Sequence, residues 1–359
     1  MAQQRSARPG STPSVTSLGD AELAATVTRL GHPPYRARQI QSWVWQKRAT
    51  GFDDMTDLPV ELRQTLKEAL RPLGSHVMAQ KQSPDGTTKL LLELEDGERV
   101  ETVLIPEGER RTACLSTQVG CPVACIFCAS GLDGVLRNLT AAEIAEQALH
   151  LERLLPGNER LTNIVVMGSG EPLLNEKNLG QALHWLNDAK RFGLGARRIT
   201  VSTVGLPEKM RRLSELGLQI ELAVSLHAPT DEIRKRIVPG ARPVGEVLDA
   251  AFAYRDATGR EVTFEYVLLE SINDGLDHAE ELARRLGGRP CLVNLIPHNP
   301  VPGVDLRAPA GPHCERFLDV LLSRGVRATL RRTKGQPIEA ACGQLRRIMR
   351  PPVPVQDPP

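Results

Sequence analysis

The chain has 359 residues, of which 41% are apolar and 25% are charged, and its formal net charge is +2. A chain of this length can bury a full core, and it suggests about two domains or one large α/β unit with an appendage. No segment approaches the roughly 18 consecutive apolar residues of a transmembrane helix, so we expect no membrane-spanning part. The small net charge does not by itself indicate a nucleic-acid partner.

The two ends of the chain and its cysteines indicate where the protein works. Residues 1–18 lack an apolar core after their basic residues, which predicts a disordered tail and not an export signal. Residues 347–359 predict a proline-rich tail. Seven cysteines in a chain without an export signal favour metal binding or reactive thiols over a disulfide scaffold. We therefore expect a cytoplasmic protein.

Residues 19–75 predict a small helical module. DAELAATVTRLG and PPYRARQIQSWVWQKRA have helical periodicity, and a third helix places Leu62, Leu66 and Leu70 on one face. Residues 76–108 then predict an antiparallel hairpin that bridges to the main domain, because turn signals flank the runs TTKLLLELE and ERVETVLIP.

Residues 109–346 predict an α/β domain in which short apolar strands alternate with helices. The clearest helix is NLTAAEIAEQALHLERLL, where Thr140 and Glu143 form a capping box. Repeated strand-helix units imply a parallel sheet with right-handed crossovers, closed or partly closed into a barrel. The predicted strands are TACLSTQ, LTNIVVMG, RRITVST, QIELAVSLH, EVTFEYVLL, RPCLVNLIP and VRATLRR.

Polar and glycine-containing segments follow these strands. They are CPVACIFC, GSGEP, STVG, SLHAP and PHNPVPG. Since ligand sites of parallel barrels are built at the carboxyl ends of the strands, the separate segments are expected to converge on one mouth.

Cys121, Cys125 and Cys128 have the spacing C-x3-C-x2-C, which two kinds of metal site can explain. A structural zinc site needs four ligands, and Cys114 can supply the fourth. Alternatively, three thiolates hold a [4Fe-4S] cluster and leave one iron open for a cofactor. The loop setting after a strand favours the cluster, with the spacing associated with radical S-adenosylmethionine (SAM) enzymes.

A SAM site would use the other loops. Glu171 in GSGEP can accept hydrogen bonds from the ammonium group of SAM. Ser202 and the segment 225–227 end later strands and can face the ribose and the carboxylate, and Asn299 can meet the adenine edge. Each of these residues alone is more often ordinary loop chemistry, but together they describe one cofactor pocket.

The remaining cysteines divide into two kinds. Cys291 and Cys314 are expected to be small buried residues. Cys342 follows a loop that holds Arg331, an environment that can favour the thiolate, although an isolated cysteine is more often structural. Cys114 stands seven residues before the trio on a predicted strand and is expected close to it.

Collinear segments from about Leu23 to Arg346 resemble the radical SAM RNA methyltransferases of the RlmN/Cfr family, and more specifically the RlmN branch. The segments are YRARQIQSWVW, DMTDLP, VETVLIPEGERRTACLSTQVGCPVACIFCASG, LRNLTAAEI, MGSGEPLLN, VSLHAP, VNLIPHNPVPG and AACGQLR. The resemblance implies an α/β fold, a partial (β/α)6 radical SAM barrel with an N-terminal helical accessory RNA-binding domain and a β-hairpin extension.

The resemblance also implies residue roles. Those that hold the [4Fe-4S] cluster are Cys121, Cys125 and Cys128. Those that bind SAM are Gly170, Glu171, Ser202, Ser225, Leu226, His227 and Asn299. Cys342 would carry the methyl group, Cys114 would resolve the covalent intermediate, and Glu101 would accept a proton.

The implied reaction is methylation of C2 of adenine in 23S rRNA and tRNA. This carbon has no nucleophilic lone pair, so one SAM first methylates Cys342, and a radical from a second SAM then activates that methyl group for addition to adenine. Attack by Cys114 on the sulfur of Cys342 would release the RNA and leave a disulfide, which a reductant resets. The implied partners are the two RNAs and an electron-donating reductase such as flavodoxin, and a monomer is expected.

Three alternatives remain at this point. Methylation at C8 is disfavoured because GEPLLN resembles the C2 branch. A radical SAM enzyme acting on another substrate would not depend on Cys342. A zinc-stabilised RNA-binding protein would have no activity. One departure from the family pattern is Ser169, where MGMGEPL is usual, and it is expected to alter packing near SAM while leaving Glu171 in place.

Colour separates the cluster from zinc. Anaerobically purified protein is expected to be brown and to contain iron and sulfide, because iron-sulfur clusters absorb visible light. Colourless protein that contains zinc would contradict the cluster.

Overall fold

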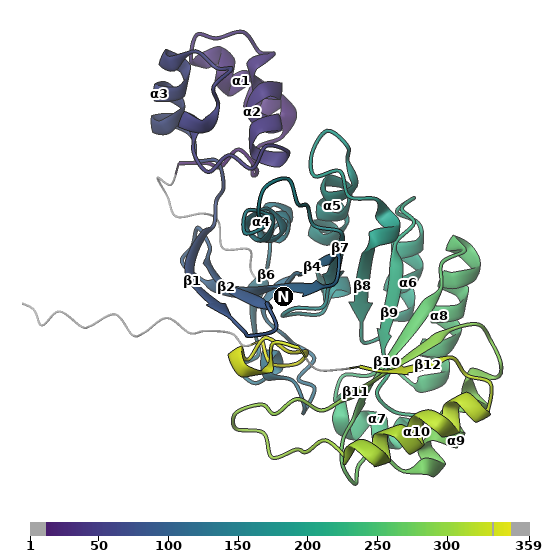
Figure 1. Ribbon diagram of the computed structural model, residues 1–359. Helices are drawn as coiled ribbons and strands as arrows, with labels where there is room; N and C mark the ends of the chain where they lie inside the picture. Colours follow the sequence, from purple (N-terminus) through teal and green to yellow (C-terminus); the bar gives the residue numbers. More distant parts are fainter. Residues whose placement is uncertain (1–11, 332–333, 346–359) are drawn as a thin grey trace, which may run out of the picture.

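The computed structural model describes residues 12–331 and 334–345. Its centre is a ten-stranded sheet in the order β1-β2-β3-β4-β7-β8-β9-β10-β11-β12 (Figure 1). Strands β1 to β4 pair antiparallel, and pairing from β4 to β12 is parallel. The strands are β1 (His76–Gln82), β2 (Thr88–Glu93), β3 (Arg99–Glu107), β4 (Arg110–Cys114), β7 (Asn163–Val166), β8 (Ile199–Thr203), β9 (Glu221–Ser225), β10 (Val262–Leu268), β11 (Leu292–Pro297) and β12 (Ala328–Leu330).

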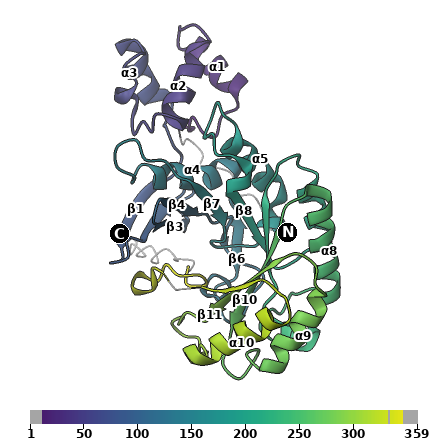
Figure 2. The same ribbon diagram turned by 45° about the vertical axis from the view of Figure 1, so that its right-hand side comes forward.

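Helices cover the outer face of the parallel strands (Figures 1 and 2). They are α4 (Ala141–Glu152), α5 (Glu176–Asn187), α6 (Pro207–Ser214), α7 (Asp231–Ile237), α8 (Val244–Thr258), α9 (Leu276–Leu286) and α10 (Gly311–Ser323). The strand order has two ends, so the predicted α/β fold with a partly closed barrel is confirmed. Within residues 12–331 and 334–345, no helix has the length and apolar character needed to cross a bilayer.

The capping box predicted ahead of α4 is present. The amide of Glu143 donates to Oγ1 of Thr140 at 3.2 Å, and the amide of Thr140 donates to Oε2 of Glu143 at 2.8 Å. Helix α4 therefore begins where its own sequence satisfies two of the free amides of its first turn.

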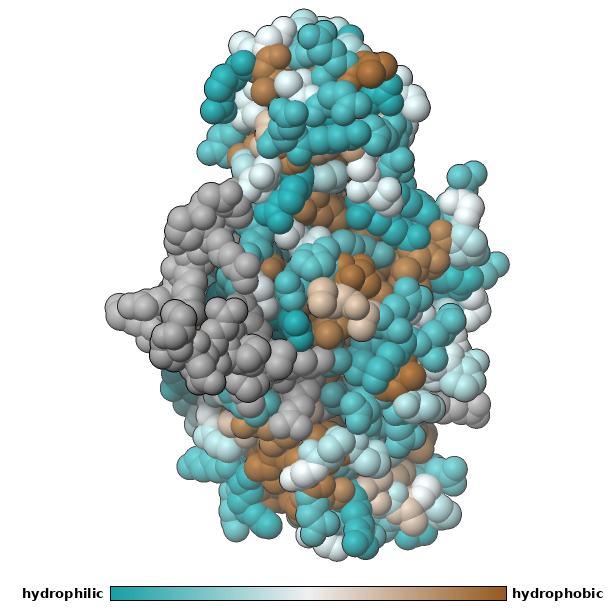
Figure 3. Space-filling model, turned by 90° about the vertical axis from the view of Figure 1, so that its left-hand side faces the viewer, coloured by the Kyte–Doolittle hydropathy of each residue, from teal (hydrophilic) through white to brown (hydrophobic). Residues whose placement is uncertain are grey.

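The helical module consists of α1 (Asp20–Arg29), α2 (Arg36–Trp45) and α3 (Val60–Ala69), and it stands at one end of the molecule (Figure 1). Figure 3 shows one face of the whole molecule, on which hydrophilic residues predominate around scattered hydrophobic patches. Arg191 joins the module to the barrel, since its guanidinium lies 5.3 Å from the ring centroid of Trp45 and 5.1 Å from that of Trp185.

The N-terminal tail predicted for residues 1–18 is too long. Val15 is fully buried, and its amide donates to the carbonyl of Arg71 at 2.8 Å. Thr16 is also fully buried and donates to Glu146 on α4. These partners are distant in the chain, so the local composition does not indicate them. Residues 1–11 and the predicted tail 347–359 lie outside the described residues.

The hairpin predicted over residues 76–108 is part of a larger structure. Strands β2 and β3 pair antiparallel as predicted, but β1 and β4 extend them on both sides. All seven residues of β1 are exposed, so the strand has none of the apolar alternation that reveals a half-buried strand. Because β4 also pairs parallel with β7, the hairpin is continuous with the barrel sheet. A second hairpin, β5 (Gln118–Gly120) with β6 (Val135–Asn138), was not predicted.

Glu146 on α4 holds the link between the helical module and β1. The amide of Gly74 donates to its Oε1 at 2.7 Å, and the amide of Ser75 donates to its Oε2 at 2.8 Å. The hydroxyls of Ser75 and Thr16 donate to the same carboxylate, which is 1% exposed. Burial raises the pKa of Glu146, and these hydrogen bonds oppose that shift. One buried carboxylate thus satisfies donors from the tail and from the linker.

Glu146→Ala is expected to lower the free energy of unfolding by at least about 2 kcal/mol, because several buried donors lose their acceptor. Urea denaturation followed by circular dichroism measures the change. Glu68→Ala removes an exposed carboxylate from α3 and is expected to stay within about 0.5 kcal/mol of the parent protein. Equal effects of the two substitutions would contradict the anchoring role of Glu146.

Candidate functional site

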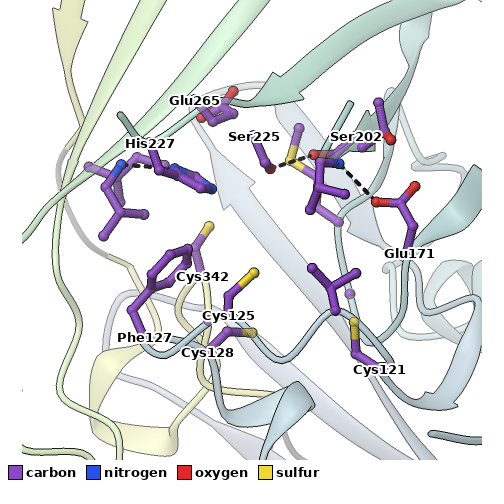
Figure 4. Close-up of a pocket in the computed structure, with 18 of the residues that line it drawn as sticks. Cys121, Cys125, Phe127, Cys128, Glu171, Ser202, Ser225, His227, Glu265 and Cys342 are labelled. Carbon is purple, nitrogen blue, oxygen red and sulfur yellow. Dashed lines mark hydrogen bonds between the residues drawn. The ribbon is translucent and has the colours of Figure 1, made fainter. Parts of the chain in front are cut away.

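A cavity opens at the carboxyl ends of the parallel strands (Figure 4). The loops predicted to converge do converge there, because parallel strands end at one rim. The site residues named from the sequence that line it are Cys121, Cys125, Cys128, Gly170, Glu171, Ser202, Ser225, His227, Asn299 and Cys342. Leu226, Cys114 and Glu101 do not line this cavity.

The cysteine loop, residues 121–128, forms one wall of the cavity. The sulfurs of Cys125 and Cys128 lie side by side in Figure 4, and Cys121 lies further along the wall. Backbone bonds support the loop, since the amide of Cys128 donates to the carbonyl of Cys125 at 3.1 Å. Gly131 packs so closely on the loop that an added Cβ would lie 2.8 Å from Cα of Ala124. This contact leaves no room for a side chain at residue 131.

The cysteine thiols suit a group that bears positive charge. Burial raises the pKa of Cys121 to about 12 and that of Cys125 well above its ordinary value, with the neighbouring thiols adding to the effect. Three partly buried thiols in one loop, with pKa values raised in this way, therefore need a metal centre to become thiolates at neutral pH. In residues 12–331 and 334–345, no three His, Cys, Asp or Glu side chains surround a point that could hold one ion. Three thiol donors beside an open cavity fit a [4Fe-4S] cluster with one free iron.

Glu171 is held in a fixed orientation at the cavity wall. Its Oε1 accepts from the amide of Leu173 at 3.0 Å, and its Oε2 accepts from the amide of Val204 at 2.8 Å. Burial raises the pKa of this carboxyl, and the two backbone bonds oppose the shift. Gly170 precedes it at φ +110°, where an added Cβ would lie 2.8 Å from the side chain of Gln118. The turn thus requires glycine at residue 170. Each carboxylate oxygen of Glu171 has a second lone pair with which it can accept a hydrogen bond from a cation.

Ser169 faces away from the cavity. Its hydroxyl donates to the carbonyl of Gly120 at 3.1 Å, and its amide donates to Oγ of Ser116 at 2.9 Å. The residue is not among those that line the cavity. Its effect is therefore on the backbone just before Cys121, and not on direct contact with a ligand.

Ser202 on β8 and Ser225 on β9 lie opposite the cysteine loop, and His227 follows two residues after the end of β9. The hydroxyls of Ser202 and Ser225 are 3.3 Å apart. His227 has φ +58°, and its Nδ1 accepts from the amide of Val267 at 3.1 Å. Burial, followed by the charge of Arg234, lowers the pKa of His227 to about 3, so the ring is neutral. A neutral ring packed edge-on against Phe127, with centroids 4.8 Å apart, is suited to contact an uncharged ring.

Leu226 is placed differently from its neighbours. Its side chain is fully buried in the main core, because alternation along β9 turns it away from Ser225. The predicted contact with SAM can therefore involve only its backbone.

Glu265 and Asn273 were missed from the sequence. Glu265 lines the cavity from β10, its Oε1 accepts from Nδ2 of Asn294 at 3.0 Å, and its Oε2 has no hydrogen-bond partner among the described residues. Asn273 is fully buried and donates to the carbonyl of His227 at 2.8 Å. The signal for Glu265 was present, because a carboxylate inside the apolar strand VTFEYVL is rarely buried without a role.

Cys342 lies where the first cavity meets a second one. It lines both cavities, and Cys114 lines the second. Cys342 is exposed, and Nη1 of Arg331 lies 3.7 Å from its sulfur. All seven cysteines are free thiols in this structure. The prediction that Cys114 lies near the trio agrees with this arrangement, since Cys114 and Cys128 line the second cavity together.

Glu101 on β3 does not line the second cavity. It is 6% exposed and pairs with Nζ of Lys89 at 2.8 Å. Lys89 also donates to the carbonyl of Glu339 at 3.0 Å, which connects this pair to the segment before Cys342.

Comparison with known proteins agrees with this geometry. Residues 115–286 match the radical SAM superfamily, and residues 15–71 match the ribosomal RNA large subunit methyltransferase N-terminal domain. The chain is 50% identical over 319 residues to a probable dual-specificity RNA methyltransferase RlmN of Rhodopirellula baltica, covering 88% of this chain and 86% of the relative. It is 47% identical to the similarly described protein of Symbiobacterium thermophilum, covering 90% and 89%.

A solved structure is also similar. The crystal structure of a radical SAM methyltransferase from Sphaerobacter thermophilus superposes with a TM-score of 0.89 at 44% identity, covering 93% of this chain and 99% of that one. Enzymes of the radical SAM superfamily use a [4Fe-4S] cluster and SAM, and the cysteine loop and cavity of this chain are built for that pair. The chain therefore belongs to the RlmN family of radical SAM RNA methyltransferases.

Proposed function

We propose that this protein methylates C2 of adenine in 23S rRNA and tRNA, and that Cys342 carries the methyl group to the base. The observation that carries the proposal is the position of Cys342, which lines both the cofactor cavity and the second cavity. A methyl group on its sulfur can thus be reached from the cofactor side and from the substrate side. The two relatives are described as probable dual-specificity RNA methyltransferases, which supports two RNA substrates.

The second cavity has the charge that an RNA substrate needs. Arg110, Arg331 and Lys334 line it, and Glu107 is its acidic member. Cationic side chains neutralise phosphates and release their counterions, so RNA binding is expected to weaken with salt. The N-terminal module, which matches a ribosomal RNA methyltransferase domain over residues 15–71, supports the same class of substrate.

The residues of the cofactor cavity have binding roles in this proposal. Cys121, Cys125 and Cys128 hold the cluster, and Glu171 binds the ammonium group of SAM. The rest of SAM is bound by the backbone of Leu226 and by Gly170, Ser202, Ser225, His227 and Asn299. When bound, the cluster and SAM together supply a carbon-centred radical by one-electron cleavage of the sulfonium. The closed apolar wall formed by Val267 and Ile296 limits access of water to that chemistry.

Three residues act on the methyl group and the base. Cys342 accepts the methyl group from SAM at its sulfur, which lies 3.7 Å from Nη1 of Arg331. After the base is bonded to the methylene on Cys342, Glu101 accepts the C2 proton, and the adduct gives up one electron, which the bound cluster would take back. Glu101 is paired with Lys89 and does not line the second cavity, so this step requires the ion pair to separate and the carboxylate to turn toward the base. The thiolate of Cys114 then attacks the sulfur of Cys342, the bond between that sulfur and the methylene breaks, and the carbon takes up a proton to become the methyl group on C2. The resulting disulfide needs two electrons from a reductant.

We propose in addition that the protein works as a monomer in the cytoplasm, where both RNAs are found, and that a reductase such as flavodoxin supplies its electrons.

Nucleoside analysis of RNA tests the function. Purified enzyme with SAM, a one-electron reductant and unmodified 23S rRNA or tRNA is expected to produce 2-methyladenosine, measured by mass spectrometry. Formation of 8-methyladenosine would replace the C2 proposal by C8, and absence of any methylated adenine with both RNAs would refute it.

The two lone thiols are expected to fail at different steps. Cys342→Ala should abolish RNA methylation, a loss of at least about a thousandfold, because the methyl carrier is removed. Cys114→Ala should accumulate a covalent protein-RNA adduct, seen as a band shift that ribonuclease removes. Cys291→Ala is the matched control, since Cys291 is buried and lies outside both cavities. Normal release of methylated RNA by Cys114→Ala would contradict its resolving role.

Burial raises the pKa of Cys114 to about 12, and the nearby Cys342 adds to the shift. The thiolate fraction below that pKa grows roughly tenfold per pH unit, so alkylation of Cys114 by iodoacetamide should rise in that proportion from pH 7 to 10. Peptide mass spectrometry gives the rate at this residue. In urea-unfolded protein the rate should level off above about pH 9, as for an ordinary thiol. A plateau near pH 9 in the folded protein would contradict the shift.

A further inference from the structure

Arg234 on α7 is a buried cation with no carboxylate within ion-pair distance among the described residues, and Asp231, at the start of the same helix, acts on it only at longer range. Its side chain is 0% exposed. Its Nε donates to the carbonyl of Arg242 at 3.2 Å, and its Nη1 donates to the carbonyl of Ser225 at 3.3 Å. Further bonds go to the carbonyls of Leu226 and Val204. Neutral carbonyls satisfy the donors but do not cancel the charge, which is costly to bury alone.

Helix α7 packs directly behind the cysteine loop. The amide of Ile126 in that loop donates to the carbonyl of Ile237 at 3.1 Å. The side chains of Ile233 and Ile237 share one apolar cluster with Phe127, and the three cysteines pack against it. Arg234 therefore lies one helical turn from the contact that fixes the loop, and it is outside the cavity lining.

Arg234 thus places a positive charge in the protein interior, behind the loop that carries the three cysteines.

We propose that Arg234 is the buried counter-charge of the three-cysteine [4Fe-4S] cluster and raises its reduction potential. Three thiolates make the oxidised centre negative, and one-electron reduction by an external low-potential donor adds one more negative charge without making or breaking a bond. A fixed cation in a poorly screened interior stabilises the more negative, reduced state. The proposal rests on the cluster, not on the RNA substrate.

Arg234 also holds the carbonyls of Val204, Ser225 and Leu226, next to the proposed SAM-binding residues. A purely structural role would change SAM affinity through these carbonyls. It would not change the potential of the cluster measured without SAM. The redox measurement therefore separates the charge of Arg234 from its contacts.

The experiment compares three variants of the full chain, each reconstituted anaerobically with iron and sulfide. Arg234→Gln removes the charge, and Arg234→Lys keeps it without the guanidinium geometry. Arg236→Gln removes a charge from the exposed side of the same helix. Without SAM or RNA, the samples are titrated with dithionite, and electron paramagnetic resonance follows the reduced cluster. We expect a more negative midpoint for Arg234→Gln, and midpoints close to that of the parent protein for Arg234→Lys and Arg236→Gln.

Each other outcome decides the proposal. Retention of four irons by Arg234→Lys but not by folded Arg234→Gln would also support it, since the charge would then be needed to form the centre. An unchanged midpoint in Arg234→Gln, equal shifts in the two Arg234 variants, equal loss of iron from both, or failure of both to fold would overturn it. RNA methylation by the parent protein is unaffected by any of these results, so the proposed function stands or falls separately.

Discussion

The hydrogen bonds that dock the C-terminal segment on the cysteine loop determine the geometry of the whole site. The amide of Ala129 donates to the carbonyl of Gly343 at 2.7 Å, and the hydroxyl of Ser130 donates to the carbonyl of Leu345 at 2.6 Å. On the other side, Nδ2 of Asn299 donates to the carbonyl of Cys342 at 3.0 Å. These bonds all end on main-chain oxygens, so they fix the segment and leave the sulfur of Cys342 free to react.

Burial controls the charge states around that sulfur. Without a metal centre the cysteine thiols stay protonated, and His227 stays neutral. Two arginines place positive charge near the site. Arg331 lies beside Cys342, and Arg234 lies behind the cysteine loop. Positive charge therefore lies at the two places where the proposed chemistry needs negative charge on sulfur.

Buried polar contacts also join the helical module to the barrel. Glu146 gathers donors from the tail and from the linker, and Arg191 lies between two tryptophans from the two parts. If the module moved, Glu146 would lose hydrogen bonds from buried donors, and Arg191 would lose its contact with one of the two rings. Either change would cost free energy, because buried polar groups would be left without partners. The module is thus held at one end of the sheet, in a constant relation to the strands that end at the cavity.

Local patterns in the sequence determined the parallel strands, the capping box of α4 and the cysteine spacing, because each depends on residues close together in the chain. The same reasoning, with the family resemblance, named most residues that line the cavity. Tertiary structure alone decided that Val15 and Thr16 are buried, that β1 joins the sheet, and that Leu226 points into the core. It also decided that Glu265 lines the cavity and that Arg234 is buried behind the cysteine loop, since the groups that surround a buried charge come together only when the chain folds.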